Sequence, residues 1–156
     1  MKNIILYDNS LELQIPDCFE LIEQEEEKKH YFPNIQPTTL YVDKETDATI
    51  GILYNDVDFT EEDIDERLGQ YYIVLKRTKP NFNYGDGMVK RKLPNGKVIG
   101  SMVYTSTTLE KDLYTIFVLG SLNGKETTIT MTFDIKDLSK YFNELMTITS
   151  SINFKK

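Results

Sequence analysis

The sequence predicts an α+β fold in which an antiparallel β-sheet is sandwiched by α-helices, and three observations support this prediction. Two Asn-Gly pairs, in LPNGK (93–97) and SLNGK (121–125), separate apolar-rich segments, which is the strongest short-range signal of a β-hairpin. The segment LYTIFVL (113–119) between them is apolar on both alternating faces, so we expect a central strand covered on both sides. Two segments with apolar residues at helical spacing would supply a helix for each face.

The first third of the chain is expected to form strands interrupted by one short helix. LELQIP (11–16) alternates apolar and polar side chains, which is typical of a half-buried strand. The Glu/Lys run that follows predicts a short helix, and Pro33 ends it. TTLYVD (38–43) and TIGILYND (49–56) then predict two strands separated by a turn.

The clearest helix is predicted in TEEDIDERLGQYYIVLKRTKP (60–80), which Pro80 ends. Thr60 and Asp63 resemble a capping box at its start. Gly69 costs about 1 kcal/mol relative to alanine in a helix, so we expect it to mark a close packing contact. The apolar residues expected on the buried face of this helix are Ile64, Leu68, Tyr71 and Leu75.

The C-terminal part is expected to add one more strand and a closing helix. In TTITMTFD (127–134) the residues Ile129, Met131 and Phe133 should point to one face of the sheet and the threonines to the other. The last segment, KDLSKYFNELMTITSSINF (136–154), predicts a helix packed on the sheet. The residues expected to face the sheet are Leu138, Phe142, Leu145 and Ile148 or Thr149.

Length and composition limit the cell compartment and the class of protein. At 156 residues the chain is expected to be a single domain, residues 1–156. Its single cysteine excludes an internal disulfide and fits a reducing compartment. The N-terminal apolar stretch is shorter than the roughly 7–15 residues of a signal-peptide core, and no apolar run approaches the roughly 20 residues of a membrane span. We therefore expect a cytoplasmic protein without membrane contact.

Charge is unevenly distributed along the chain. The net charge of −7 argues against nucleic-acid binding, because phosphates would be repelled at long range. Residues 1–70 carry 18 acidic and 5 basic side chains, whereas residues 71–156 carry 7 acidic and 13 basic ones. This asymmetry predicts either two opposed surface patches or two halves that interleave in space.

The stretch CFELIEQEEEKKHYFP (18–33) holds the only cysteine and the only histidine of the chain. Cys18 and His30 could in principle pair as nucleophile and base. However, no glycine-rich oxyanion loop or helix start follows Cys18 to support such a pair. We interpret Cys18 as a small residue in a turn and His30 as a side chain at a helix end.

Metal binding is also weakly supported by the pattern of residues. Glu26 and His30 could share a helix face, but an i,i+4 interaction, alongside Glu25 with Lys29, explains the same spacing. The acidic run DVDFTEEDIDE (56–66) has glutamate where a calcium loop needs glycine, and arginine follows where that loop needs a bidentate glutamate. A helix start stabilised by acidic side chains is the simpler interpretation. We expect no metal site.

Catalytic and cofactor-binding signatures are missing from the sequence. It contains no nucleophile elbow, dinucleotide fingerprint or phosphate-binding loop. We therefore expect no enzyme activity, no catalytic residues and no cofactor. Ten tyrosines instead offer the rigid, amphipathic contact area that is enriched in protein interfaces. The candidate partner-binding residues are Tyr31, Phe32, Tyr71 and Tyr72.

The order of these elements resembles the PsbP-like superfamily, in particular its DcrB-like bacterial branch. LELQIPDCFELIE (11–23) is similar to the apolar-x-Ile/Val-Pro-x-Gly/Ala-Phe/Trp start of many members, with Cys18 in place of the usual small residue. The resemblance implies an α/β/α sandwich around an antiparallel sheet. It also implies a non-enzymatic role as a binding, scaffolding or chaperone module, and it carries over no catalytic residues.

The leading hypothesis is a cytoplasmic protein-binding module, such as a chaperone or adaptor for another protein. The first alternative is an immunity protein that neutralises a toxin, which would also be small and acidic. The second is a weak divalent-metal-binding protein that uses the acidic runs. The identity of a protein partner and the oligomeric state stay open at this stage.

Overall fold

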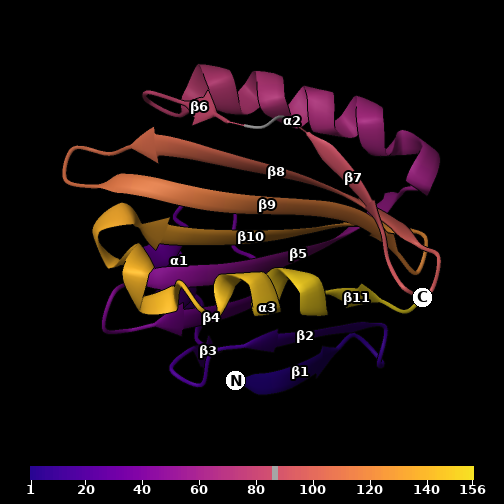
Figure 1. Cartoon of the computed structure of the whole chain (residues 1–156), viewed down its shortest axis with the longest axis horizontal. Helices are drawn as coiled ribbons and strands as arrows, with labels where there is room; N and C mark the ends of the chain where they lie inside the picture. The colour runs from indigo at the N-terminus through magenta and orange to yellow at the C-terminus, as the bar shows by residue number, and fades with distance from the viewer. Residues whose placement is uncertain (86–87) are drawn as a thin grey trace.

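The computed structural model describes residues 1–85 and 88–156, which form two antiparallel sheets with helices on either side (Figure 1). The large sheet has the strand order β3-β4-β5-β10-β9-β8-β6, and β7 pairs with another part of β8. Its strands are β3 (Glu20–Ile22), β4 (Thr39–Asp43), β5 (Ala48–Asp58), β6 (Asn83–Tyr84), β7 (Val89–Lys92), β8 (Val98–Thr107), β9 (Asp112–Leu122) and β10 (Lys125–Asp134). The small sheet, in the order β1-β2-β11, consists of β1 (Lys2–Leu6), β2 (Leu11–Ile15) and β11 (Asn153–Phe154).

Helical segments cover both faces of the large sheet. They are α1 (Glu25–Tyr31), the 3₁₀ turn η1 (Glu61–Asp63), α2 (Ile64–Thr78), the 3₁₀ segment η2 (Ile135–Tyr141) and α3 (Leu145–Ser151). Helix α2 packs on β8 and β9, whereas α3, η2 and the small sheet pack on the opposite face (Figure 1). This arrangement confirms the predicted α+β fold. Among the residues described, no helix is both long and apolar enough to cross a membrane.

Strand β9 is buried on both faces, as predicted for the segment 113–119. Ile116 and Val118 point into the core beneath the small sheet and α3. Phe117 and Leu119 point into the core beneath α2. The absence of polar alternation in this strand therefore reflects a position in the middle of the sandwich.

Both Asn-Gly hairpins form where they are predicted. The turn in 93–97 joins β7 to β8, and the turn in 121–125 joins β9 to β10. In the second turn both central residues have positive φ angles, 53° at Asn123 and 75° at Gly124. Positive φ at both central positions belongs to the type I′ turn that matches the twist of the flanking strands.

Helix α2 begins and packs as predicted, except at its glycine. The Asp63 carboxylate accepts a hydrogen bond of 2.9 Å from the Thr60 amide, which completes the capping interaction. All four residues of the predicted face pack into the core over β8 and β9. The close packing contact expected at Gly69 is wrong, because a Cβ atom at that position would meet nothing within 4 Å.

The close contact lies instead at Gly100 of strand β8. A Cβ atom there would lie 2.6 Å from Leu68 Cδ1 and 2.7 Å from Ile64 Cγ2. The absence of a side chain on the strand, rather than on the helix, is therefore what lets α2 approach the sheet.

The closing helix differs from its prediction. The segment splits into η2 and α3, and Phe142, predicted to face the sheet, is 76% exposed, whereas its neighbour Tyr141 is fully buried. A 3₁₀ helix has three residues per turn, so Leu138 and Tyr141 share a side and Phe142 is turned outward. The Tyr141 hydroxyl also bonds to Asp43, which fixes this residue on the inside.

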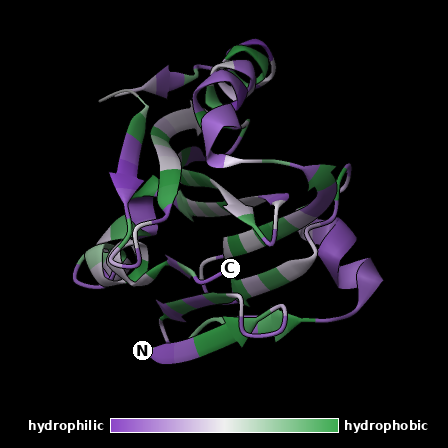
Figure 2. Ribbon diagram, turned by 90° about the vertical axis from the view of Figure 1, so that its right-hand side faces the viewer, coloured by the Kyte–Doolittle hydropathy of each residue, from purple (hydrophilic) through white to green (hydrophobic). Residues whose placement is uncertain are grey.

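The strands of the two differently charged halves of the chain lie toward opposite edges of the large sheet. Residues 1–58 supply β3, β4 and β5, and residues 83–134 supply the remaining strands. Two segments cross this division: the acidic start of α2 packs over β8 and β9, and residues 135–156 return to pack beside β2. Each of the two alternatives for the charge asymmetry therefore holds in part: the strands are separated, whereas the start of α2 and the last segment interleave with the other half. Figure 2 shows the acidic helix α1 as hydrophilic along its length, with no buried residue.

Candidate functional site

An apolar groove opens at the surface beside helix α2. It lies between this helix and the loop 32–37, above strands β5, β10, β9 and β8, and its volume is about 300 Å³. We call it the α2 groove. The helix contributes Tyr71, Val74, Leu75 and Lys79, the loop contributes Phe32, Ile35 and Pro37, and the strands contribute Gly51, Leu53, Tyr104, Phe117, Thr128 and Thr130.

Local sequence explains why the loop side of the α2 groove lies close to the sheet. A Cβ atom at Gly51 would come within 3.3 Å of Phe32 Cζ and 3.4 Å of Pro37 Cβ, so the two rings lie directly on the strand at this glycine. The Gln36 side-chain amide donates a 3.0 Å hydrogen bond to the Phe32 carbonyl, which closes the loop on itself. The apolar rings of the loop therefore form a wall of the groove.

A buried carboxylate holds the Tyr71 ring in place on the helix side. Glu126 of β10 is buried and pairs with the guanidinium of Arg67. The same carboxylate accepts hydrogen bonds from the Tyr71 hydroxyl at 3.2 Å and from the Asn55 amide at 3.0 Å. Burial raises the pKa of the Tyr71 hydroxyl, which stays a neutral donor. With its hydroxyl fixed, the Tyr71 ring packs on Phe117, with 4.8 Å between ring centroids.

Two apolar side chains stand at the rim of the α2 groove. Ile35 is 69% exposed on the loop side and Val74 is 55% exposed on the helix side. Each lines the groove while leaving much of its surface in water. The groove therefore continues to the surface as apolar area.

Two of the four sequence-predicted residues, Phe32 and Tyr71, lie in the α2 groove. The other two lie elsewhere. Tyr31 packs beside Phe32 on the apolar cluster of β3 and β4, and the centroid of its ring lies 4.9 Å from that of the His30 ring. Tyr72 packs against the rings of Phe82 and Tyr84, at 5.7 and 4.7 Å between centroids. Whether any of the four contacts a partner stays a prediction.

Sequence reasoning missed Ile35 and Val74. Ile35 stands between Pro33 and Pro37, where an apolar residue in a short loop is itself a signal. Val74 belongs to the apolar run 73–75 of α2, which is wider than the single stripe needed for packing. An apolar face of α2 that is wider than packing on the sheet requires is a signal in the sequence, and it could have identified the helix side of the groove.

A second apolar groove lies on the opposite face, between α3 and strands β7, β8 and β9, with a volume of about 660 Å³. We call it the α3 groove. Phe142 and the 80% exposed Met146 stand at its rim. The Arg91 guanidinium donates a 2.7 Å hydrogen bond to the Thr149 carbonyl and so links β7 to α3 across this groove.

Cys18 belongs to a polar cluster centred on Asp43, and its thiol does not pair with His30. The Asp43 carboxylate accepts hydrogen bonds from Lys140 at 2.7 Å, from the buried Tyr141 hydroxyl, from the Glu45 amide at 3.1 Å and from the Cys18 thiol at 3.4 Å. Burial and the neighbouring carboxylate raise the pKa of the Cys18 thiol, which makes it a poor nucleophile. The cluster joins η2 to strand β4.

The Asp43 cluster predicts a loss of stability in acid. Burial alone would raise the pKa of Asp43, but hydrogen bonds from Lys140, Tyr141, the Glu45 amide and Cys18 outweigh it and hold the pKa below its ordinary value. The stabilisation is therefore present at neutral pH and is lost as the pH falls through the folded-state value. Replacing Asp43 by asparagine should cost about 1 kcal/mol at pH 7.

Melting curves of the wild type and Asp43→Asn between pH 7 and pH 2.5 test this prediction. The gap between their melting temperatures should narrow below about pH 4, where the carboxyl of the unfolded chain takes up its proton. A gap that is constant over the whole range would contradict the role assigned to the ionised carboxylate.

The acidic side chains form ion pairs with lysines at several places. In α1 the pairs are Glu25 with Lys28 and Glu26 with Lys29, so the predicted i,i+4 spacing is wrong and the spacing is i,i+3. In the second acidic run Asp56 and Asp58 pair with Lys125 of β10. Within residues 1–85 and 88–156, no three histidine, cysteine, aspartate or glutamate side chains gather as a metal site would require.

No protein-family model and no curated protein sequence matches the chain. Solved structures do match. Cyanobacterial PsbP (CyanoP) from Synechocystis sp. PCC 6803 has a TM-score of 0.64 at 11% identity, covering 98% of this chain and 91% of that one. PA94 from Pseudomonas aeruginosa, a protein of unknown function described as a putative regulator, has a TM-score of 0.58 at 13% identity, covering 97% and 94%.

LpqN from Mycobacterium tuberculosis, involved in cell envelope biogenesis, has a TM-score of 0.61 at 12% identity, covering 99% of this chain and 90% of that one. Each similarity extends over nearly the whole of both chains, although the identities are low. The resemblance expected from the order of elements is therefore confirmed at the level of the fold. The chain has the PsbP-like fold.

Proposed function

We propose that the chain is a non-enzymatic protein-binding module, an adaptor or chaperone, whose partner places apolar side chains in the α2 groove. The observation that carries the proposal is the continuity between the apolar groove and the exposed rim residues Ile35 and Val74. The proposal keeps the cytoplasmic location expected from the sequence. A putative regulator and a protein of envelope biogenesis among the similar structures are compatible with a binding role.

The volume of the α2 groove supports a protein partner over a small molecule. At about 300 Å³ it lies at the lower end of the range for small-molecule sites, roughly 300–1,000 Å³. It is also open along its rim rather than enclosed, with Val74 on one side and Ile35 on the other. Such a site holds one or two apolar side chains of a larger partner, whose remaining contacts lie outside the groove.

Replacing Val74 by glutamate should weaken binding of the partner about tenfold or more, because a charge would then stand at the apolar rim. Ile73→Glu is the matched control: Ile73 is 50% exposed on the same helix and does not line the groove. Neither substitution should shift the melting temperature by more than a few degrees, since both sites face water.

Affinity purification from the native cell with wild type, V74E and I73E provides the measurement, followed by reconstitution of the recovered protein with the purified chain. The partner should be recovered by wild type and I73E and lost with V74E. A partner that V74E binds as tightly as the wild type would contradict the proposed surface. If the recovered partner is a toxin, the immunity-protein alternative replaces the adaptor.

A further inference from the structure

We infer that the α2 groove takes a peptide segment that combines apolar side chains with acidic residues at one end. This inference rests on the proposed function and adds the chemistry of the partner segment. The acidic residues would lie at the C-terminal end of α2, beside Arg77 and Lys79. The supporting observations are the position of these two cations, their lack of an ion-pair partner among the described residues, and the ion pairs that the glutamates of α1 form with lysines on the other side of the groove.

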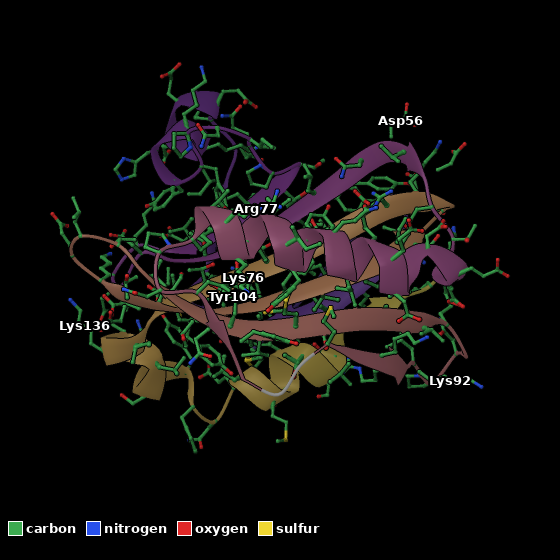
Figure 3. The ribbon with its side chains drawn as sticks, turned by 90° about the horizontal axis from the view of Figure 1, so that it is seen from above. Asp56, Lys76, Arg77, Lys92, Tyr104 and Lys136 are labelled. Atoms are coloured by element: carbon green, nitrogen blue, oxygen red, sulfur yellow. The ribbon has the colours of Figure 1, made fainter. Side chains whose placement is uncertain are left out.

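Lys79 is part of the groove lining, and Arg77 stands one helical turn beyond the rim residue Val74. Figure 3 shows Arg77 on the side of α2 that faces the N-terminal strands and α1, which is the side of the groove. The same view shows Lys76 on the opposite side of the helix, where its ammonium lies 5.9 Å from the centroid of the Tyr72 ring. The end of the groove nearest the helix C-terminus therefore carries two positive charges.

Arg77 and Lys79 belong to the cations that form no ion pair among the described residues, as Lys76 and Lys92 also do, whereas several other cations are paired. Arg67 pairs with Glu126 and Lys90 pairs with Asp65, so both are compensated internally. Within the part of the chain that the structure describes, neither Arg77 nor Lys79 forms an ion pair, and both are exposed. Arg77 and Lys79 are therefore both free to pair with a carboxylate of a partner.

The opposite wall of the groove does not cancel this attraction. Helix α1 carries three consecutive glutamates, and each of them pairs with a lysine. The pairs are Glu25 with Lys28, Glu26 with Lys29 and Glu27 with Lys44. The acidic helix beside the loop is thus largely compensated, whereas the cations at the end of α2 are not. The local field at this end of the groove favours an anion, although the whole chain is acidic.

A simpler account assigns these cations to the helix dipole, which basic residues in the last turn complement. That account treats Lys76 and Lys79 alike, because both lie at the C-terminal end of α2. The inference treats them differently, because only Lys79 lines the groove. The two residues therefore form a matched pair for a test.

The experiment selects peptides from a random display library with the full chain as bait. We expect the enriched peptides to combine apolar residues with an Asp or Glu at one end. The affinity of the most enriched peptide is then measured by fluorescence anisotropy for the wild type, V74E, K79E and K76E. K79E should weaken binding about tenfold, since it replaces an attraction by a repulsion, and K76E by less than about twofold.

The outcomes separate this inference from the proposed function. Peptides that bind in a V74E-sensitive way without acidic residues, or equal effects of K79E and K76E, would overturn the inference and leave the proposed function standing. A library that yields no V74E-sensitive peptide would overturn both. Sedimentation of the bait alone completes the test: a dimer that V74E dissociates would make a second copy of the chain the occupant and would overturn the acidic-peptide inference.

Discussion

Replacing Phe154 by alanine is expected to lower the free energy of unfolding by about 3–5 kcal/mol, the usual range for a fully buried phenylalanine. The Phe154 ring lies between the small and the large sheet, so close to β9 that a Cβ atom at Gly120 would come within 2.5 Å of it. The backbone at Phe154 and Lys155 is also hydrogen-bonded. The Asn95 side chain donates to the Phe154 carbonyl at 2.8 Å, and the Lys155 amide donates to the Ser10 carbonyl at 2.7 Å.

Urea denaturation of Phe154→Ala beside Phe142→Ala measures this effect. The same atoms are removed in both variants, but Phe142 is exposed, so its loss should change stability by no more than about 0.5 kcal/mol. Equal losses in the two variants would mean that the packing of β11 against the large sheet does not hold the fold together.

The second large effect is expected from Gly100→Val, which should cost about 3 kcal/mol through overpacking. The new Cβ would stand 2.6 Å from Leu68 Cδ1 and 2.7 Å from Ile64 Cγ2, so these two buried side chains would have to shift. Helix α2 would have to move away from β8. Since α2 also forms one side of the α2 groove, peptide binding should fall together with stability.

Gly69→Ala is the control on the helix itself, where a Cβ atom would meet nothing within 4 Å. This variant should gain about 0.5–1 kcal/mol, because alanine has the higher helix propensity and no contact is disturbed. Thermal melts of the two variants should therefore shift in opposite directions from the wild type. A destabilised Gly69→Ala would show that the helix packs more tightly there than the structure indicates.

Much of the fold could be predicted because it depends on local patterns. The Asn-Gly turns, the doubly apolar strand and the face of α2 are properties of short segments, and each is found where it was expected. Strand β1 and the small sheet were not predicted, since β11 pairs with β2 from the other end of the chain. A contact between residues far apart in sequence also explains the wrong prediction for Phe142. The Tyr141 hydroxyl bonds to Asp43, so Tyr141 is buried in place of Phe142, and no local pattern shows this contact.

The candidate site was predictable only in part. Phe32 and Tyr71 were selected as aromatic residues at element ends and on helix faces, and the fold brings both to one groove. That groove depends on Gly51 of β5 lying beneath a loop from another part of the chain, which no local pattern encodes. The roles of Arg77 and Lys79 depend on which carboxylates lie nearby, and this too is a property of the folded chain.

The strand order of the large sheet has a consequence for synthesis of the protein. Strands β3 to β5 come from one continuous stretch and β6 to β10 from another, and the two groups meet only where β5 pairs with β10. As the ribosome makes the chain from its N-terminus, the long edge of β5 stays without its partner until residue 134 has emerged. An unpaired strand edge readily pairs with other chains. The nascent protein is therefore most exposed to aggregation while its second half is still being made.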